Sequence, residues 1–178
     1  MALVGSIPFN SRSSNLRLSN AMKEIYDIVE EPRGDDYRLL LECCSAYCQI
    51  ALLVVREGDW LEPSASEFLK NLNPFEVEKR RQSEWPGTSL LDHEATVYYY
   101  SLCRESLHIL KHAVDRLFDW QQPYLPEDLC LLRNENDPML VTIAHEKDAF
   151  LFLTPDEKAN LLRAVPNIQL KQPGPGPS

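Results

Sequence analysis

The sequence predicts an α+β fold that is predominantly α. We expect a helical bundle of about five helices, followed by a small three-stranded antiparallel β-meander and a C-terminal helix. Three observations lead to this prediction: apolar residues recur at helical spacing through much of residues 20–122, short β-rich runs begin after Pro123, and a helix-capping motif stands at Thr154.

Two long helices form the centre of the predicted bundle. Residues 36–57 are apolar around most of a helix circumference, which is typical of a helix buried among others. Residues 89–120 carry an apolar stripe at spacings of three and four residues, which indicates a second long helix packed against the first. Three shorter helices are expected over residues 20–31, after a capping-box pair at Ser64 and Glu67, and after Asn73.

The C-terminal part of the chain predicts strands and one capped helix. Residues 129–133 and 139–144 are short β-rich runs separated by turn-forming residues, which indicates a hairpin. Residues 149–153 follow a polar turn and complete the meander. A helix ending near residue 165 follows, marked by its cap, its first-turn proline and its third-position acid: Thr154, Pro155 and Glu157.

These elements predict a single globular domain over residues 20–166. Its expected parts are the bundle over 20–122 and the meander with its helix over 127–166. Residues 167–178 are rich in proline and glycine, which favours a disordered tail. Residues 1–19 are expected to be a flexible leader. The sequence just before Met22 resembles the remnant that an expression vector leaves before a native methionine. Two interpretations stay open: the leader is derived from a vector, or it is native and the resemblance is a coincidence.

The 178-residue chain has a globular composition, with 44% hydrophobic and 25% charged residues and a net charge of −9. The acidity is uneven, since residues 121–160 contain eight acidic residues against three basic ones. Such a surface repels phosphate backbones and anionic membranes, so neither nucleic acid nor a membrane is an expected partner. Two interpretations of the acidity stay open: it attracts a basic protein, or it keeps the protein soluble.

The cysteine count and the missing motifs narrow the class of protein. Five cysteines, an odd number without regular spacing, argue against a disulfide framework and favour a reducing cytoplasm. No apolar run is long enough for a transmembrane helix. The chain lacks glycine-rich phosphate loops and the nucleophile-elbow motif, so no cofactor is expected.

Histidine and cysteine pairs give three candidates for chemistry. His108 and His112 lie one helical turn apart and could hold a metal with Glu105 and Asp115, or could belong to an ordinary polar face. Cys44 and Cys48 could join the two histidines in a zinc site, although they also suit a buried helix. Cys130 could be a nucleophile with His145 as its base, or could simply pack inside the sheet.

A candidate partner-binding surface lies on the predicted meander and its flanking loops. Antiparallel strands bring loops together at one end of a sheet, so the polar turn at residues 145–148 and the acids at 127–128 are expected to be neighbours. Tryptophan and tyrosine at loop junctions are either interface anchors or plugs that fix a loop to the core. The candidate surface comprises Glu127, Asp128, Glu135, Asp137, His145, Glu146, Asp148, Trp85, Trp120 and Tyr124.

These observations favour a non-enzymatic protein–protein interaction protein over an enzyme. The leading hypothesis is an acidic binding domain, regulatory or resembling bacterial immunity proteins in general type, that recognises a basic partner through electrostatic steering and aromatic anchors. The first alternative is a metal-dependent or cysteine-dependent enzyme built on the pairs above. The second is a structural homo-oligomer that pairs through apolar surface.

Overall fold

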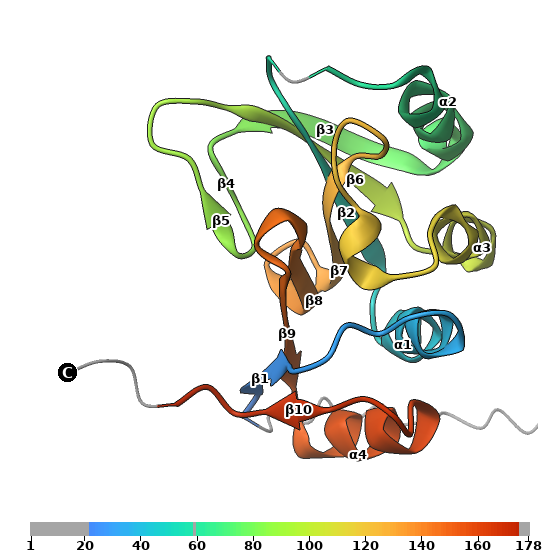
Figure 1. Ribbon diagram of the computed structural model, residues 1–178, viewed down its shortest axis with the longest axis vertical. Helices are drawn as coiled ribbons and strands as arrows, with labels where there is room; N and C mark the ends of the chain where they lie inside the picture. Colours follow the sequence, from blue (N-terminus) through green and yellow to red (C-terminus); the bar gives the residue numbers. More distant parts are fainter. Residues whose placement is uncertain (1–21, 59, 175–178) are drawn as a thin grey trace, which may run out of the picture.

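The chain forms one large antiparallel sheet with helices on one of its faces (Figure 1). The computed structural model describes residues 22–58 and 60–174, so the predicted leader over 1–19 lies outside the described residues. The sheet has eight strands in the order β10-β1-β9-β8-β7-β2-β6-β3, and a separate hairpin pairs β4 with β5. Every strand pair is antiparallel.

The described elements have the following bounds. The strands are β1 Glu24–Ile28, β2 Ile50–Arg56, β3 Glu76–Gln82, β4 Glu84–Trp85, β5 Thr88–Ser89, β6 Ala95–Ser101, β7 Glu127–Asn134, β8 Asp137–Ile143, β9 Asp148–Leu153 and β10 Leu170–Lys171. The α-helices are α1 Asp35–Ser45, α2 Pro63–Leu72, α3 Arg104–Ala113 and α4 Pro155–Ala164. Short 3-10 helices are η1 Asn73–Phe75, η2 Leu117–Asp119 and η3 Ala144–Glu146.

The prediction of a helical bundle is wrong, because the sheet rather than a bundle organises the molecule. The segment expected to be a helix over 20–31 contains strand β1, and the one over 36–57 divides into α1 and β2. Strand β2 lies in the middle of the sheet and is covered on both faces, so its side chains look apolar all round. A buried strand and a buried helix share that pattern, and the β-branched residues at its end favour the strand.

The long helix expected over 89–120 is also wrong. The segment instead holds strand β6, helix α3 and helix η2. The run Thr96-Val97-Tyr98-Tyr99-Tyr100 is β-branched and aromatic, which suits a pleated strand. Helix α3 then begins after Cys103, where the side chain of Ser106 accepts a hydrogen bond from the Cys103 backbone N–H at 2.9 Å. The apolar spacing of three and four therefore crosses two elements of different kind.

The three strands and the capped helix predicted after Pro123 are present, but the strands belong to the eight-stranded sheet and do not form a small separate one. Strands β7, β8 and β9 are consecutive neighbours in the sheet and form the expected meander. Helix α4 begins with the expected capping box, in which Thr154 accepts from the backbone N–H of Glu157 and Glu157 accepts from that of Thr154. The C-terminal segment adds one more strand, since Leu170 and Lys171 pair with β1 inside the region expected to be a disordered tail.

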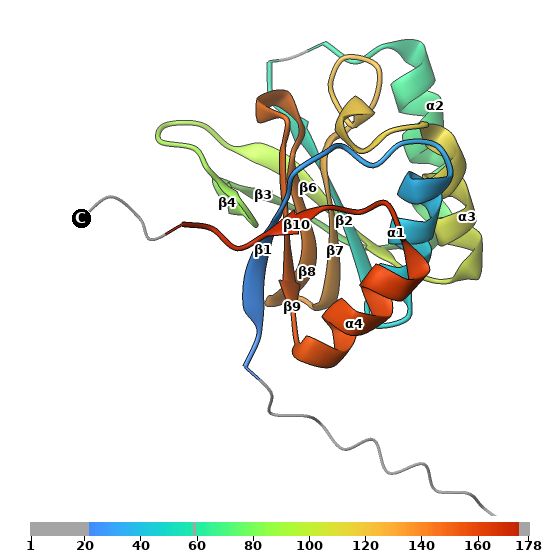
Figure 2. The ribbon, with the colours of Figure 1, turned by 60° about the horizontal axis from the view of Figure 1, so that its bottom comes forward.

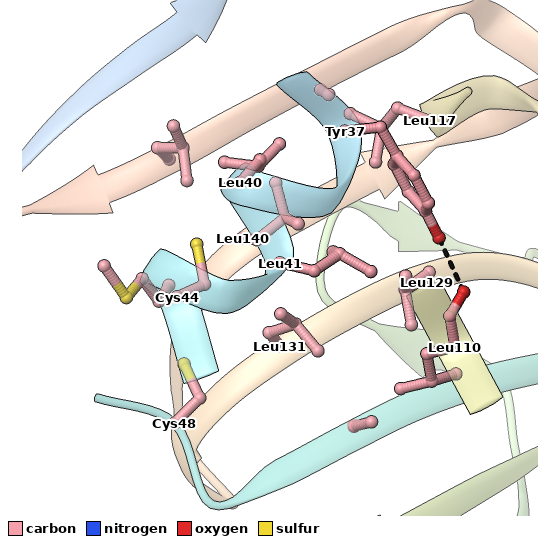
Figure 3. Close-up of a cluster of buried hydrophobic side chains, with 14 of the residues drawn as sticks. Tyr37, Leu40, Leu41, Cys44, Cys48, Leu110, Leu117, Leu129, Leu131 and Leu140 are labelled. Atoms are coloured by element: carbon pink, nitrogen blue, oxygen red, sulfur yellow. Dashed lines mark hydrogen bonds between the residues drawn. The ribbon is translucent and has the colours of Figure 1, made fainter. Parts of the chain in front are cut away.

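The helices α1 to α4 cover one face of the sheet (Figure 2). Helix α1 lies on β7 and β8, where Leu40, Leu41 and Cys44 pack against Leu131 and Leu140, all fully buried (Figure 3). The hydroxyl of Tyr37 donates to the Leu110 carbonyl at 2.9 Å, which ties α1 to α3 (Figure 3). None of the helices in residues 22–58 and 60–174 is long and apolar enough to cross a membrane.

The β4–β5 hairpin covers part of the opposite face (Figure 2). Its buried Trp85 packs in a second apolar cluster with Leu52, Cys130 and Val141. The turn residue Gly87 has φ +86°, and a Cβ built there would lie 2.9 Å from Cγ1 of Val141. Glycine therefore allows the hairpin both to turn and to lie flat on β8.

Candidate functional site

Four ionisable side chains meet at one end of the sheet, and we call them the charged cluster: Arg56, Glu127, Asp128 and His145. Arg56 ends β2, and Glu127 begins the neighbouring β7. Because the two strands are antiparallel and Val54 pairs with Glu127, Arg56 and Glu127 lie at the same end of the sheet. His145 lies in η3, between β8 and β9. Ligand atoms of Glu127, Asp128 and His145 all lie within 4.8 Å of one another. The structure thus brings together the acids and the histidine that the sequence placed at one end of the sheet.

Asp128 is the buried centre of this cluster. Its side chain is fully buried and its backbone is left-handed, with φ 56°. One carboxylate oxygen accepts from Nε1 of Trp85 at 3.0 Å, and the other accepts from the backbone N–H of Ala144 at 3.0 Å. Burial raises the pKa of Asp128, and these two donors together with the charge of Arg56 act against that rise. Asp128 therefore ties the β4–β5 hairpin and η3 to the start of β7.

Arg56 supplies the positive charge of the cluster. Its Nε donates to Glu127 at 2.5 Å, and one Nη lies 3.9 Å from Asp128 and 3.4 Å from Nδ1 of His145. Its guanidinium also lies 5.6 Å from the centre of the Trp85 ring. Two carboxylates and a histidine are donors that suit a divalent metal. Here the guanidinium lies among those same donors, so a metal could bind only by displacing Arg56.

Two exposed aromatic rings lie on the loops that follow β2 and precede β7, and with Gln122 and Pro123 we call them the aromatic rim. The side chains of Trp60 and Tyr124 are 66% and 68% exposed. Their loops are joined, because the backbone N–H of Glu62 donates to the Pro123 carbonyl at 2.8 Å. The side-chain oxygen of Gln122 accepts from the backbone N–H of Arg56 at 2.6 Å. The rim is therefore fixed to the end of β2 beside the charged cluster.

Two hollows open at the rim and share Gln122. The first, of about 680 Å³, lies between α2 and residues 113–125 and is lined mainly by apolar groups, among them Phe68, Val114 and Phe118. The second, of about 350 Å³, is lined by Trp60, Gln122, Pro123 and Glu127. Hollows with apolar walls and a few polar groups are the usual shape of binding sites.

The structure distributes the predicted surface residues unevenly. Trp120 is fully buried, donates to the Tyr37 hydroxyl at 3.2 Å and meets Phe68 edge-on, so it is a plug that fixes its loop. Trp85 is a plug as well. Tyr124 alone of the three predicted aromatic residues is exposed.

The predicted acids fall into three groups. Glu127 and Asp128 are buried in the charged cluster. Glu135 forms an ion pair with Arg80, and Asp137 forms one with Arg133 at 3.1 Å. The acids that remain exposed beside the cluster, Glu146 and Asp148, lie in or next to η3.

The histidine pair on α3 is brought together without a complete ligand set. The rings of His108 and His112 lie 4.3 Å apart, and Nδ1 of His112 lies 2.8 Å from the His108 carbonyl oxygen. Asp115, which could have joined them, forms an ion pair with Arg38. Among the described residues, the one group of three ligands close enough to share a metal is in the charged cluster, and it includes neither histidine.

The cysteines are free thiols, and Cys44, Cys48 and Cys130 are buried. Burial raises the pKa of Cys130 and of Cys48 to about 12 and raises that of Cys44 well above its ordinary value. At neutral pH these thiols are protonated, and a protonated buried thiol is a poor nucleophile or metal ligand. Cys130 packs with Leu52 and Leu132, which matches the alternative that it belongs to the core of the sheet.

Sequence reasoning missed Arg56, Trp60 and Gln122. Arg56 is the first charged residue after the apolar run of residues 50–55, and this position could have indicated the end of a buried strand. It was overlooked because the run was assigned to a helix. Trp60 lies two residues after Gly58, which has a positive φ of +84° and turns the chain after the end of β2.

No family model, curated protein or solved structure matches this chain. A function can therefore be drawn only from the residues and geometry of the chain itself.

Proposed function

We propose that this protein is a non-enzymatic binding protein that recognises a basic partner protein through the aromatic rim. The observation that carries the proposal is the pair Trp60 and Tyr124, two large rings about two-thirds exposed on loops joined at Pro123. Exposed tryptophan and tyrosine beside a hollow are favoured anchors of protein interfaces, because they bury much area with few rotatable bonds.

Charge supports a basic partner. The charged cluster beside the rim has two carboxylates for one guanidinium, and Glu146 and Asp148 are exposed close by in the chain. The whole chain carries a net charge of −9. Such a field speeds the approach of a cationic surface and disfavours an anionic one.

The chemistry of the cysteines supports the non-enzymatic reading and a reducing compartment. The buried thiols described above are held protonated, and all five cysteines are free. Free thiols persist in the cytoplasm, where disulfides are rare. We therefore place the binding function in the cytoplasm as part of the same proposal.

The experiment is a capture from lysate of the native host with immobilised wild-type protein and a Trp60→Ala/Tyr124→Ala double variant. A control variant, Leu91→Ala, removes a side chain that is 97% exposed and lines neither hollow. We expect a basic protein that the wild type and the control retain, that the double variant loses, and that salt releases. Equal retention by all three proteins, or retention that salt does not weaken, would refute the proposal.

A further inference from the structure

Gln122 lines both hollows at the rim, and its side-chain amide has a donor that is not used. The side-chain nitrogen of Gln122 is buried and has no hydrogen-bond partner among the described residues. Its orientation is fixed, because the oxygen of the same amide accepts from the Arg56 backbone N–H. A buried amide N–H without an acceptor is costly, so a polar group that reaches this side chain would be favoured.

The walls of the hollows define the chemistry on either side of this donor. On one side, Phe68, Phe118 and Leu125 offer an apolar surface between α2 and residues 113–125. On the other side, Trp60 and Glu127 line the same hollow, and the Glu127 carboxylate also accepts from Arg56. An indole face beside a carboxylate suits a guanidinium or ammonium group. Within the described chain, the residues that line the two hollows include Asp119 and Glu127 but no lysine, arginine or histidine.

We propose that the rim binds a short segment of the partner in which an apolar side chain adjoins a lysine or arginine. The apolar side chain fills the hollow beside α2, the basic side chain lies between Trp60 and Glu127, and the peptide group that joins them lies beside Gln122. This assignment rests on the proposed function and names the chemical class of the segment that the partner supplies.

The first test uses small probes and the full chain. A ¹⁵N-labelled sample is titrated with the capped dipeptide Ac-Leu-Arg-NH₂ and, as controls, Ac-Ser-Arg-NH₂ and Ac-Leu-Glu-NH₂. We expect the side-chain amide of Gln122 and the indole N–H of Trp60 to shift with Ac-Leu-Arg-NH₂, with a Kd on the order of 1 mM. Each control should bind about fivefold more weakly or worse. Equal shifts with all three probes, or no shift at these two groups, would overturn the inference.

The second test fills the hollow without touching the aromatic anchors. Ser64 is exposed at the start of α2 and lines the apolar hollow, so Ser64→Phe places a ring inside it. Glu67→Phe puts the same ring on an exposed position of α2 outside the lining and is the matched control. We expect Ser64→Phe to weaken binding of Ac-Leu-Arg-NH₂ about tenfold and Glu67→Phe to leave it unchanged.

The outcomes separate this inference from the function on which it rests. If capture of a partner depends on Trp60 and Tyr124 but is unaffected by Ser64→Phe, the binding function stands and the assigned segment is wrong. If capture does not depend on the two rings, the proposed function itself fails. The amide spectrum of each variant reports whether it is folded, and the dipeptide titration of the wild type decides the inference even where a variant does not fold.

Discussion

At the scale of single residues, the burial of Asp128 decides how the hairpin and the sheet are joined. Its two oxygens satisfy two separate donors, the Trp85 indole and the Ala144 amide. Aspartate and asparagine tolerate the left-handed backbone found here better than other side chains do. The same residue thus meets a backbone requirement and a hydrogen-bonding requirement, which explains a buried carboxylate at this position.

Asp128→Ala should lower the free energy of unfolding by about 3 kcal/mol, because two buried donors lose their acceptors. Asp128→Asn should cost less, since it keeps one acceptor and the backbone preference. Urea unfolding followed by tryptophan fluorescence measures both. Asp148→Ala, which removes an exposed carboxylate from β9, is the control and should change stability by less than about 0.5 kcal/mol. Equal losses for the alanine and asparagine variants of Asp128 would contradict this role.

Glu157 shows how a carboxylate can link a helix to the sheet in a pH-dependent way. Burial alone would raise its pKa, but hydrogen bonds from Arg133 and from the Thr154 backbone outweigh burial and lower it. An acid with a lowered pKa in the folded state stabilises the fold above its ordinary pKa and loses that effect as pH falls through the lowered value.

Glu157→Gln should therefore destabilise the protein by about 2 kcal/mol at pH 7 and by much less near pH 3. Chemical unfolding at the two pH values measures the difference. Asp156→Asn removes an exposed acid from the same helical turn and should show only the small effect of the helix dipole. A Glu157→Gln deficit that stays constant between the two pH values would count against the ion pair with Arg133.

At the scale of secondary-structure elements, the β4–β5 hairpin is held by shape as well as by Asp128. Gly87→Ala introduces a Cβ that meets Val141 at 2.9 Å and Ile143 at 3.2 Å, in a backbone conformation with positive φ. Gly58 has nearly the same φ, +84°, but open space where its Cβ would be. Substituting each glycine by alanine thus separates two contributions to the loss of stability: the strain of a positive φ, which both variants have, and the steric clash, which only Gly87→Ala has.

We expect Gly58→Ala to cost about 1 kcal/mol and Gly87→Ala about 2–3 kcal/mol. The fluorescence of Gly87→Ala should also shift to the red as Trp85 becomes hydrated. Thermal unfolding and emission spectra check both statements. If the two variants lose the same stability, the hairpin does not lie on β8 in the way described.

The elements also explain which parts of the fold could be predicted. The cap at Thr154 and the turn between β7 and β8 are local signals, and they gave the correct meander and helix. Strand β2 gave no such signal: its side chains are covered by helices on one face and by Trp85 and its neighbours on the other, so the period of two disappears. For the same reason the role of Arg56 was not predicted, since the residue indicates a site only when the segment before it is known to be a strand.

The partner-binding surface was predictable only in part, for a similar reason. Sequence order places residues 127–128 and 145–148 at one end of a meander, and they are found there. Whether a tryptophan in a loop is a plug or an anchor depends on packing from distant elements: Trp120 meets Phe68 of α2, whereas Trp60 is 66% exposed. The sequence around each tryptophan does not indicate whether its side chain is buried or exposed.

At the scale of the whole molecule, the two edges of the sheet are treated differently. At one edge, β3 pairs only with β6 among the described strands and exposes the charged residues Glu78, Lys79 and Arg81. Charged side chains on an edge strand discourage pairing with other chains. At the other edge, the chain returns after α4 and adds β10 beside β1. The C-terminal segment therefore covers the end of β1 at Asp27 and Ile28.

Deleting residues 167–178 should consequently destabilise the entire fold. The deletion removes Ile168, which is 8% exposed in the main core, and the carbonyl of Gln169 that accepts from the Val29 backbone N–H at 2.9 Å. It also removes the strand pairing of Leu170 and Lys171. We expect a loss of about 3 kcal/mol and a Tm lower by roughly 10 °C.

Deleting only residues 175–178 is the control and should leave Tm unchanged within about 1 °C. Because β1 pairs on its other side with β9, a large loss would show that the return of the chain stabilises the meander on which the charged cluster stands. Equal Tm values for the two deletions would mean that β10 adds nothing to the sheet.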